Sequence, residues 1–167
     1  TTYVYARCSS HLFFVVAYFV FFFLRLCRHP RSSLSSSSAA SYGYKRQPGS
    51  SLGENRLKLT QDLLDNWIDL FPDEKSALPE LPPGMISAIT MRAFLEAVIP
   101  RPKGNIHGTQ EFEVQALPKC GDMLVTKIFC EAKEMRNDNK WVYFETVTQN
   151  LAGDLFFKGR MGIIWGA

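Results

Sequence analysis

Residues 82–102 read PPGMISAITMRAFLEAVIPRP, and this stretch decides the fold of the chain. Between its flanking prolines, the polar side chains are limited to Ser87, Thr90, Arg92 and Glu96. A helix that is apolar on nearly all sides is a buried helix, and proline is excluded from helix interiors. The stretch therefore predicts a buried helix over residues 85–98.

Downstream of this helix, the apolar side chains recur at every second position. Polar turns separate four such segments, at residues 110–116, 123–134, 141–149 and 155–165. Period-two alternation is typical of strands, and consecutive strands joined by short polar turns predict an antiparallel meander. A buried helix followed by a long antiparallel sheet favours an α+β fold.

A second helix is predicted upstream of residue 82. Thr60 is an N-cap residue type, and Asp62 follows in the first turn, where an acid is favourable. The apolar face at helical spacing consists of Leu63, Leu64, Trp67, Ile68, Leu70 and Phe71. Pro72 ends this helix, and the proline- and acid-rich residues 72–83 are predicted to form a loop.

The first 50 residues differ sharply from the rest, because they carry six basic residues and no acidic one. Residues 12–24 form an uninterrupted apolar run, shorter than the roughly 20 residues of a membrane span. Three interpretations stay open: a signal-peptide core, an organelle transit peptide, or translated non-coding sequence. We divide the chain into an apolar and basic N-terminal segment (1–27), a disordered Ser-rich linker (28–55) and one domain (56–167).

Charge and cysteine spacing argue against several functions of the domain. The domain has a net negative charge and no basic face, so nucleic-acid binding is not expected. Four cysteines without a CxxC pair provide no start for a zinc site. We interpret them as reduced thiols, which fits the cytoplasm or an organelle matrix, and we expect no membrane association of the domain.

Short motifs follow one another in an order that resembles a known family. They are PPGMI at 82–86, LPKCGD at 117–122, TQNLAGD at 148–154 and GRM at 159–161. Over about residues 57–165, this succession resembles the MaoC-like acyl-CoA hydratase/dehydratase family. The resemblance implies a hotdog fold, in which a curved antiparallel sheet wraps around a central helix. It also implies a homodimer, or a heterodimer with a catalytic hotdog subunit.

The resemblance implies a reaction as well, namely addition of water to an enoyl-CoA thioester without any metal or redox cofactor. In that family, an Asp and a His act as general base and acid, and an amide at the start of the central helix stabilises the developing oxyanion. The corresponding loop here, residues 70–80, contains Asp73 and Glu74 but no histidine. Gly84 and Met85 at the helix start are the expected thioester-binding residues, and His107 is a catalytic or substrate-lining candidate.

Four functions remain open on this basis. We favour a catalytically deficient half or subunit that binds the acyl-CoA thioester. The alternatives are an active hydratase that uses His107, a hotdog thioesterase in which Asp73 or Glu74 activates water, and a non-enzymatic acyl-binding or scaffold protein. The competing structural interpretations are local hydrogen bonding for His107, solvated loop charges for Asp73 and Glu74, and turn stabilisation for Asp122. Core or dimer contacts are expected of Trp67, Trp141 and Trp165.

Overall fold

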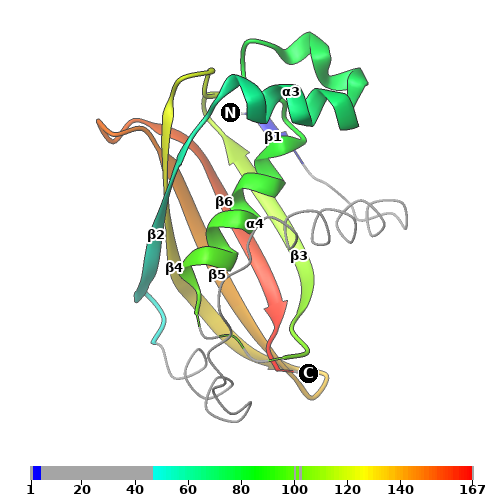
Figure 1. Ribbon diagram of the computed structural model, residues 1–167. Coiled ribbons are helices and arrows are strands. Elements are labelled where there is room, and N and C mark those ends of the chain that lie inside the picture. Colours follow the sequence, from blue (N-terminus) through cyan, green and yellow to red (C-terminus); the bar gives the residue numbers. More distant parts are fainter. Residues whose placement is uncertain (1, 5–46, 100, 102, 167) are drawn as a thin grey trace.

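The computed structural model describes residues 2–4, 47–99, 101 and 103–166. Its strands form one antiparallel sheet in the order β1-β3-β6-β5-β4-β2 (Figure 1). The strand bounds are β1 Thr2–Val4, β2 Ser51–Lys58, β3 Ile106–Val114, β4 Met123–Arg136, β5 Asn139–Gln149 and β6 Leu155–Ile164. The helices are α3 Gln61–Leu70, the 3-10 helix η1 Pro72–Ala77, and α4 Met85–Ala97.

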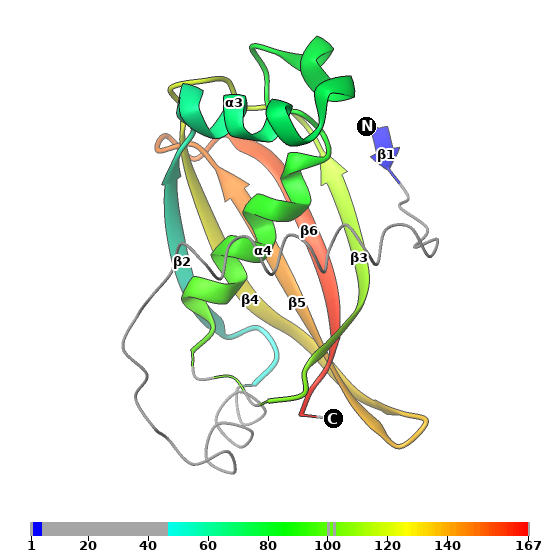
Figure 2. The ribbon, with the colours of Figure 1, turned by 45° about the vertical axis from the view of Figure 1, so that its right-hand side comes forward.

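Helix α4 lies along the concave side of the curved sheet (Figures 1 and 2). Its buried residues are Met85, Ile86, Ile89, Thr90, Ala93 and Phe94. The predicted buried helix and the predicted α+β architecture are therefore confirmed. A helix with apolar side chains over most of its circumference has to be buried on more than one side, and the concave side of the curved sheet provides part of this cover.

The sheet topology differs from a meander in sequence order. Strands β4, β5 and β6 do follow one another as hairpins, but β3 pairs with β6 and not with β4. The connection from β3 to β4 thus crosses the sheet. Period-two alternation identifies strands but carries no information about their partners, so the order of β3 was predicted wrongly.

The domain also begins earlier than residue 56. Ser51–Lys58 pairs with β4 as an edge strand, and the turn before it is tied in because the Gly49 amide donates to the Cys130 carbonyl. Leu52 and Leu57 pack against the core from this strand. The linker assignment is therefore wrong for residues 51–55. These residues are mostly small or polar and lack the apolar alternation from which a strand is predicted, although one side of the strand faces the core.

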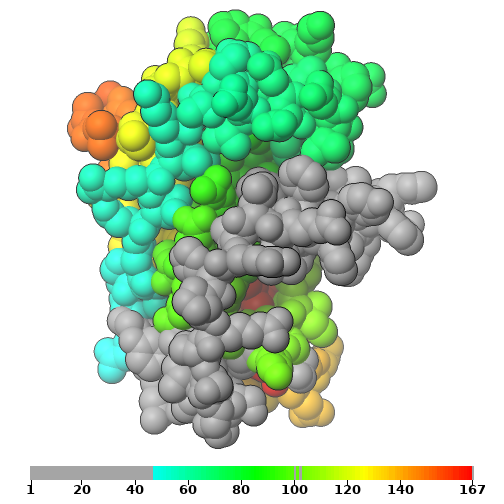
Figure 3. Space-filling view, viewed as in Figure 1, coloured from blue at the N-terminus to red at the C-terminus, as the bar shows by residue number. Residues whose placement is uncertain are grey.

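Helix α3 crosses the end of the sheet at the start of α4 (Figure 2). The predicted cap is present, since the Leu63 amide donates to Thr60 Oγ1 at 3.4 Å. Leu64 and Trp67 are the buried residues of α3. In the space-filling view, the segment with α3 and η1 covers this end of the molecule (Figure 3).

The apolar core of the described residues consists of two clusters. The first, the Trp67 cluster, comprises Leu59, Leu64, Trp67, Leu81, Met85, Ile86, Ile89, Leu124 and Phe157. The second, the Phe94 cluster, comprises Ala93, Phe94, Val98, Ile128, Cys130, Val142, Phe144, Met161, Ile163 and Trp165. The clusters contact opposite halves of α4, so each half of the helix has its own set of sheet partners.

A layer of threonines separates the two clusters. It consists of Thr90 on α4, Thr126 on β4, and Thr146 and Thr148 on β5, all of them buried. Thr126 and Thr148 share a hydrogen bond of 2.9 Å between their hydroxyls, and Thr146 Oγ1 donates to the Gly159 carbonyl at 3.3 Å. Thr90 Oγ1 has no hydrogen-bond partner among the described residues. The helix–sheet interface is thus polar at its centre.

The structure describes only a small part of the N-terminal 46 residues, so it leaves most of the assignments made there untested. Residues 2–4 form β1, which pairs with the end of β3. The apolar run at 12–24 and the Ser-rich stretch up to residue 46 lie outside the described residues. Within the ranges that the structure does describe, no helix is both long and apolar enough to traverse a bilayer.

Candidate functional site

The segment before α4 is fixed to the connection between β3 and β4. The Leu81 amide donates to the Pro118 carbonyl at 2.8 Å, and the Cys120 amide donates to the Pro79 carbonyl at 3.4 Å. Glu80 and Lys119 add a β-bridge and an exposed ion pair of 3.7 Å. These bonds hold the residues that lead into α4, so the start of the central helix is preorganised.

Glu74 is directed at the start of α4 from the preceding 3-10 helix. Its carboxylate Oε2 accepts a hydrogen bond of 2.8 Å from the indole Nε1 of Trp67 on α3. Trp67 is buried and its ring lies 4.6 Å from that of Phe71. A buried indole N–H needs an acceptor, and Glu74 provides it. The carboxylate is therefore held in place and is not a freely solvated loop charge.

Gly84 lies directly against this carboxylate. A Cβ added at Gly84 would be 2.3 Å from Glu74 Oε1 and 3.0 Å from Glu74 Cδ. The backbone of Gly84 has φ −62° and ψ −29°, which any residue adopts. Position 84 therefore favours glycine because the Glu74 carboxylate occupies the space of a Cβ, and not because of the backbone conformation.

The amide of Gly84 lies at the start of the helix and points to no acceptor among the described residues. The next two amides are used, because Met85 N–H donates to the Pro82 carbonyl at 2.9 Å and Ile86 N–H to the Pro83 carbonyl at 3.2 Å. Among the described residues, no acceptor takes the Gly84 amide. The first amides of a helix carry partial positive charge, so this donor can bind a carbonyl oxygen.

The remaining predicted residues lie elsewhere. Met85 is buried in the Trp67 cluster, so its side chain is a core residue at the start of α4. Asp73 is exposed beside Glu74. Asp122 accepts a 2.7 Å hydrogen bond from the Lys119 amide, which confirms its expected role in the turn.

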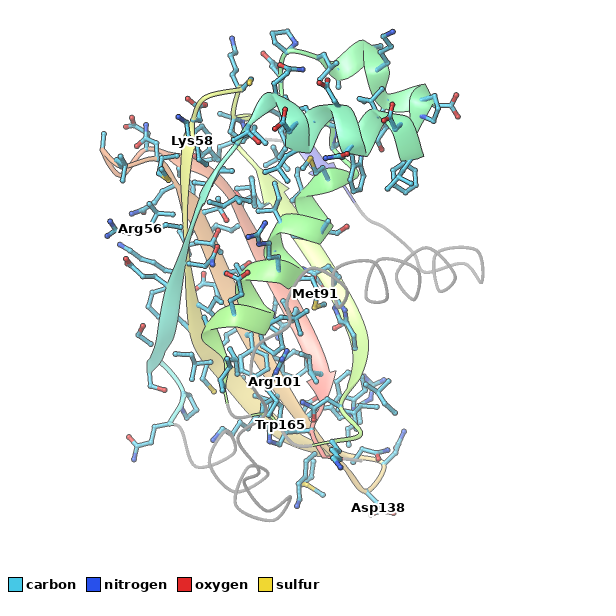
Figure 4. All side chains as sticks on the ribbon, viewed as in Figure 1. Arg56, Lys58, Met91, Arg101, Asp138 and Trp165 are labelled. Atoms are coloured by element: carbon cyan, nitrogen blue, oxygen red, sulfur yellow. The ribbon has the colours of Figure 1, made fainter. Side chains whose placement is uncertain are left out.

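His107 is far from Gly84. It pairs with Ile163, a member of the Phe94 cluster at the opposite end of α4. Figure 4 marks that end by Trp165 and by Asp138 of the β4–β5 turn. Because α4 has 13 residues, the two ends are separated by roughly 20 Å. The ring Nε2 of His107 lies 3.1 Å from the Thr109 carbonyl oxygen, and desolvation by burial lowers the pKa of this imidazole.

The structure thus brings Glu74 and Gly84 together with Trp67, and it separates His107 from them. Trp67 was assigned only to an apolar face, although the need of a buried indole N–H for an acceptor was a usable signal. Within the part of the chain that the structure describes, no three side chains of His, Cys, Asp or Glu gather closely enough to hold a metal ion.

A curved antiparallel sheet around a central helix is the hotdog fold, and comparison with solved structures confirms this prediction. The chain is similar to the MaoC-like dehydratase from Rhodospirillum rubrum, with a TM-score of 0.60 and 18% identity over 73% of this chain and 94% of that one. The chain is also similar to the R-hydratase PhaJ1 from Pseudomonas aeruginosa, with a TM-score of 0.58 and 20% identity over 73% of this chain and 83% of that one. A third similar structure is the HadBC (3R-hydroxyacyl-ACP dehydratase) complex from Mycobacterium tuberculosis, with a TM-score of 0.56 and 12% identity over 70% of this chain and 95% of that one.

At these identities, the likeness establishes the fold. The solved structures of this fold that the chain resembles include MaoC-like dehydratases and R-hydratases. No protein-family model and no curated protein matches the sequence.

Proposed function

We propose that this chain is a MaoC-like hotdog domain that binds an acyl-CoA thioester at the amide of Gly84 and does not hydrate it by itself. The observation that carries the proposal is the Gly84 amide at the start of a central helix, which has no acceptor among the described residues, next to a loop that contains carboxylates but no histidine. Helix-terminal amides stabilise a carbonyl oxygen that becomes negative. The domain thus retains the part of the site that polarises the thioester.

The missing part is the acid–base pair. Addition of water to an enoyl thioester requires one group to accept a proton from water and one to deliver a proton to the substrate. Positioned acid–base groups contribute about 10²–10⁴-fold. Glu74 can serve as one such group, but its hydrogen-bond donor is the indole of Trp67, which does not exchange protons in this way. We therefore expect hydration close to the uncatalysed rate.

A catalytic hotdog subunit would supply the pair in a dimer. The similar solved structures include the HadBC complex, which contains two different chains. In the present chain, β3 lies near one edge of the sheet, and among the described residues the strand partner on that side is β1, which pairs with Phe112–Val114. The rest of this side of β3 has no strand partner among the described residues, and an unpaired edge is suited to strand addition, so we propose pairing through β3.

One observation favours a second candidate, thioester hydrolysis. Glu74 is a single carboxylate placed beside the Gly84 amide, so it could take a proton from water as the water oxygen attacks the thioester carbonyl carbon. The carbon–sulfur bond would then break, and the thiolate would leave and be protonated. Release of free thiol separates this reaction from hydration, which leaves the thioester intact.

The test uses crotonyl-CoA and a matched pair of variants, Gly84→Ala and Gly84→Pro. Both add a Cβ that displaces Glu74, but only proline removes the amide N–H. Because proline at position 84 also disfavours the turn conformation of Pro83, the melting temperatures of the two variants are compared before their affinities. We expect calorimetry to detect binding by the wild type and by Gly84→Ala and a loss of at least about tenfold in affinity for Gly84→Pro. Equal affinity of both variants, when their melting temperatures are equal to each other, would contradict binding at this amide.

Hydration and thiol release are measured on the same samples. We expect both rates to stay near background for the wild-type chain alone. Rapid hydration by the isolated chain that is lost in His107→Ala would establish the active-hydratase alternative. Thiol release that is lost in Glu74→Gln but not in Asp73→Asn would establish hydrolysis.

A further inference from the structure

We propose that residues 72–77, hereafter the lid, are latched over the start of α4 by the Glu74 carboxylate, and that an acyl thioester opens the lid when it binds at Gly84. The ligand in this inference rests on the proposed function. The latch itself rests on contacts of the described residues. The consequence is a domain whose binding site is closed in the absence of ligand.

The two halves of the loop between α3 and α4 are held in different ways. Residues 79–82 are fixed by backbone hydrogen bonds to the β3–β4 connection. The lid has no buried residue, and its backbone hydrogen bonds stay local, such as Glu74 N–H to the Phe71 carbonyl and Leu78 N–H to the Lys75 carbonyl. Within the described residues, the hydrogen bond that ties the lid to another element is the one between Glu74 and Trp67 of α3. A segment with so few anchors opens locally at low cost.

The Glu74 carboxylate and a thioester oxygen bound to the Gly84 amide compete for the same space beside Gly84. Oε1 is 2.3 Å from the Cβ position of Gly84, which places it within about 5 Å of the Gly84 nitrogen. A carbonyl oxygen bound to that amide carries partial negative charge, and like charges at such a distance repel each other. The space beside Gly84 is also filled by the carboxylate. Binding therefore favours the state in which Glu74 has turned away.

Turning away releases the lid, because the same carboxylate holds Trp67. Its Oε2 bonds to the indole while its Oε1 lies on Gly84, so the two contacts are made and lost together. When the lid opens, the Trp67 indole N–H loses its carboxylate acceptor. The loss of this hydrogen bond is a free-energy cost of opening, which favours the closed lid when no ligand is bound. Trp67 is in this sense a positioning residue that acts through Glu74.

Trypsin cleavage after Lys75 reports the opening directly. Lys75 is exposed within the lid, and Arg136 at the exposed β4–β5 turn is an internal reference for protease activity on the folded domain outside the lid. Fragments are quantified by mass spectrometry on the full chain. Glu74→Ala is the test variant, and Asp73→Ala is its control, because it removes the same charge from the neighbouring exposed position. Trp67→Phe removes the indole donor from the other side.

We expect cleavage after Lys75, relative to cleavage after Arg136, to rise roughly tenfold to hundredfold in Glu74→Ala and Trp67→Phe, the range for loss of a hydrogen bond to a charged group. It should stay unchanged in Asp73→Ala. Saturating crotonyl-CoA should raise it in the wild type and have no further effect in Glu74→Ala. Equal relative cleavage in wild type, Glu74→Ala and Trp67→Phe would overturn the latch.

The ligand experiment separates this inference from the proposed function. If the variants accelerate cleavage but calorimetry detects no crotonyl-CoA binding, the latch stands and the proposed ligand is wrong. If crotonyl-CoA binds through Gly84 and slows cleavage after Lys75, the proposed function stands and ligand-driven opening is overturned. In that case Glu74 is a group that closes on the ligand.

Discussion

Replacement of Thr90 by valine is expected to stabilise the domain. Thr90 is fully buried on α4, and its hydroxyl has no partner among the described residues. An unsatisfied buried hydroxyl costs about 1–3 kcal/mol, whereas valine has the same shape and a similar helix propensity. We expect Thr90→Val to raise the free energy of unfolding by about 1 kcal/mol and the melting temperature by about 3–5 °C.

The matched control is Thr126→Val in the same layer. Thr126 shares its hydrogen bond with Thr148, so its replacement leaves the Thr148 hydroxyl buried without this partner. We expect a loss of about 1–3 kcal/mol, measured by urea unfolding of the same protein preparations. The reasoning would be refuted if Thr90→Val lost as much stability as Thr126→Val. That result would mean that a bound group, such as an ordered water, satisfies the Thr90 hydroxyl.

Three further predictions concern the site and its surroundings. Gly84→Ala should push the Glu74 carboxylate off the helix start and so free the indole of Trp67, with a cost of about 1 kcal/mol; a change in tryptophan emission would report it, and unchanged emission would contradict the contact. His107 has a pKa lowered by desolvation, so the unfolded state binds its proton more readily and stability should decline as the pH falls below about 6.5. His107→Asn should remove that part of the decline when urea unfolding is compared at pH 7.5 and 5.5, and an identical decline would argue against it. Asp122→Ala should lower stability by about 1 kcal/mol through loss of the acceptor for the Lys119 amide, whereas a loss below about 0.3 kcal/mol would show that the turn does not depend on this bond.

Local patterns were sufficient for the elements of this fold. The apolar stretch in residues 85–98 predicted α4 almost to the residue, because a helix without a polar face has to be buried. Thr60 and Pro72 marked the ends of α3 through capping and through the missing proline amide. Strands β4, β5 and β6 followed from period-two alternation and polar turns. Each of these signals acts within a few residues, so each can be read from a linear chain.

Long-range contacts were not accessible in the same way. The pairing of β3 with β6, and the entry of Ser51–Lys58 as an edge strand, depend on which sheet edge is free after the other strands have paired. The isolated Thr90 hydroxyl likewise depends on how α4 is positioned against the threonines of the sheet.

The candidate site divides along the same line. Gly84 could be named from its place at the start of the predicted helix, and the absence of histidine from residues 70–80 could be read directly. The sequence could not show that Glu74, and not its neighbour Asp73, faces Gly84. That selection is made by the Trp67 indole, which is buried on α3 and needs an acceptor, and by a glycine without a Cβ that lets the carboxylate approach. Both conditions are met only when α3, the lid and α4 come together in space.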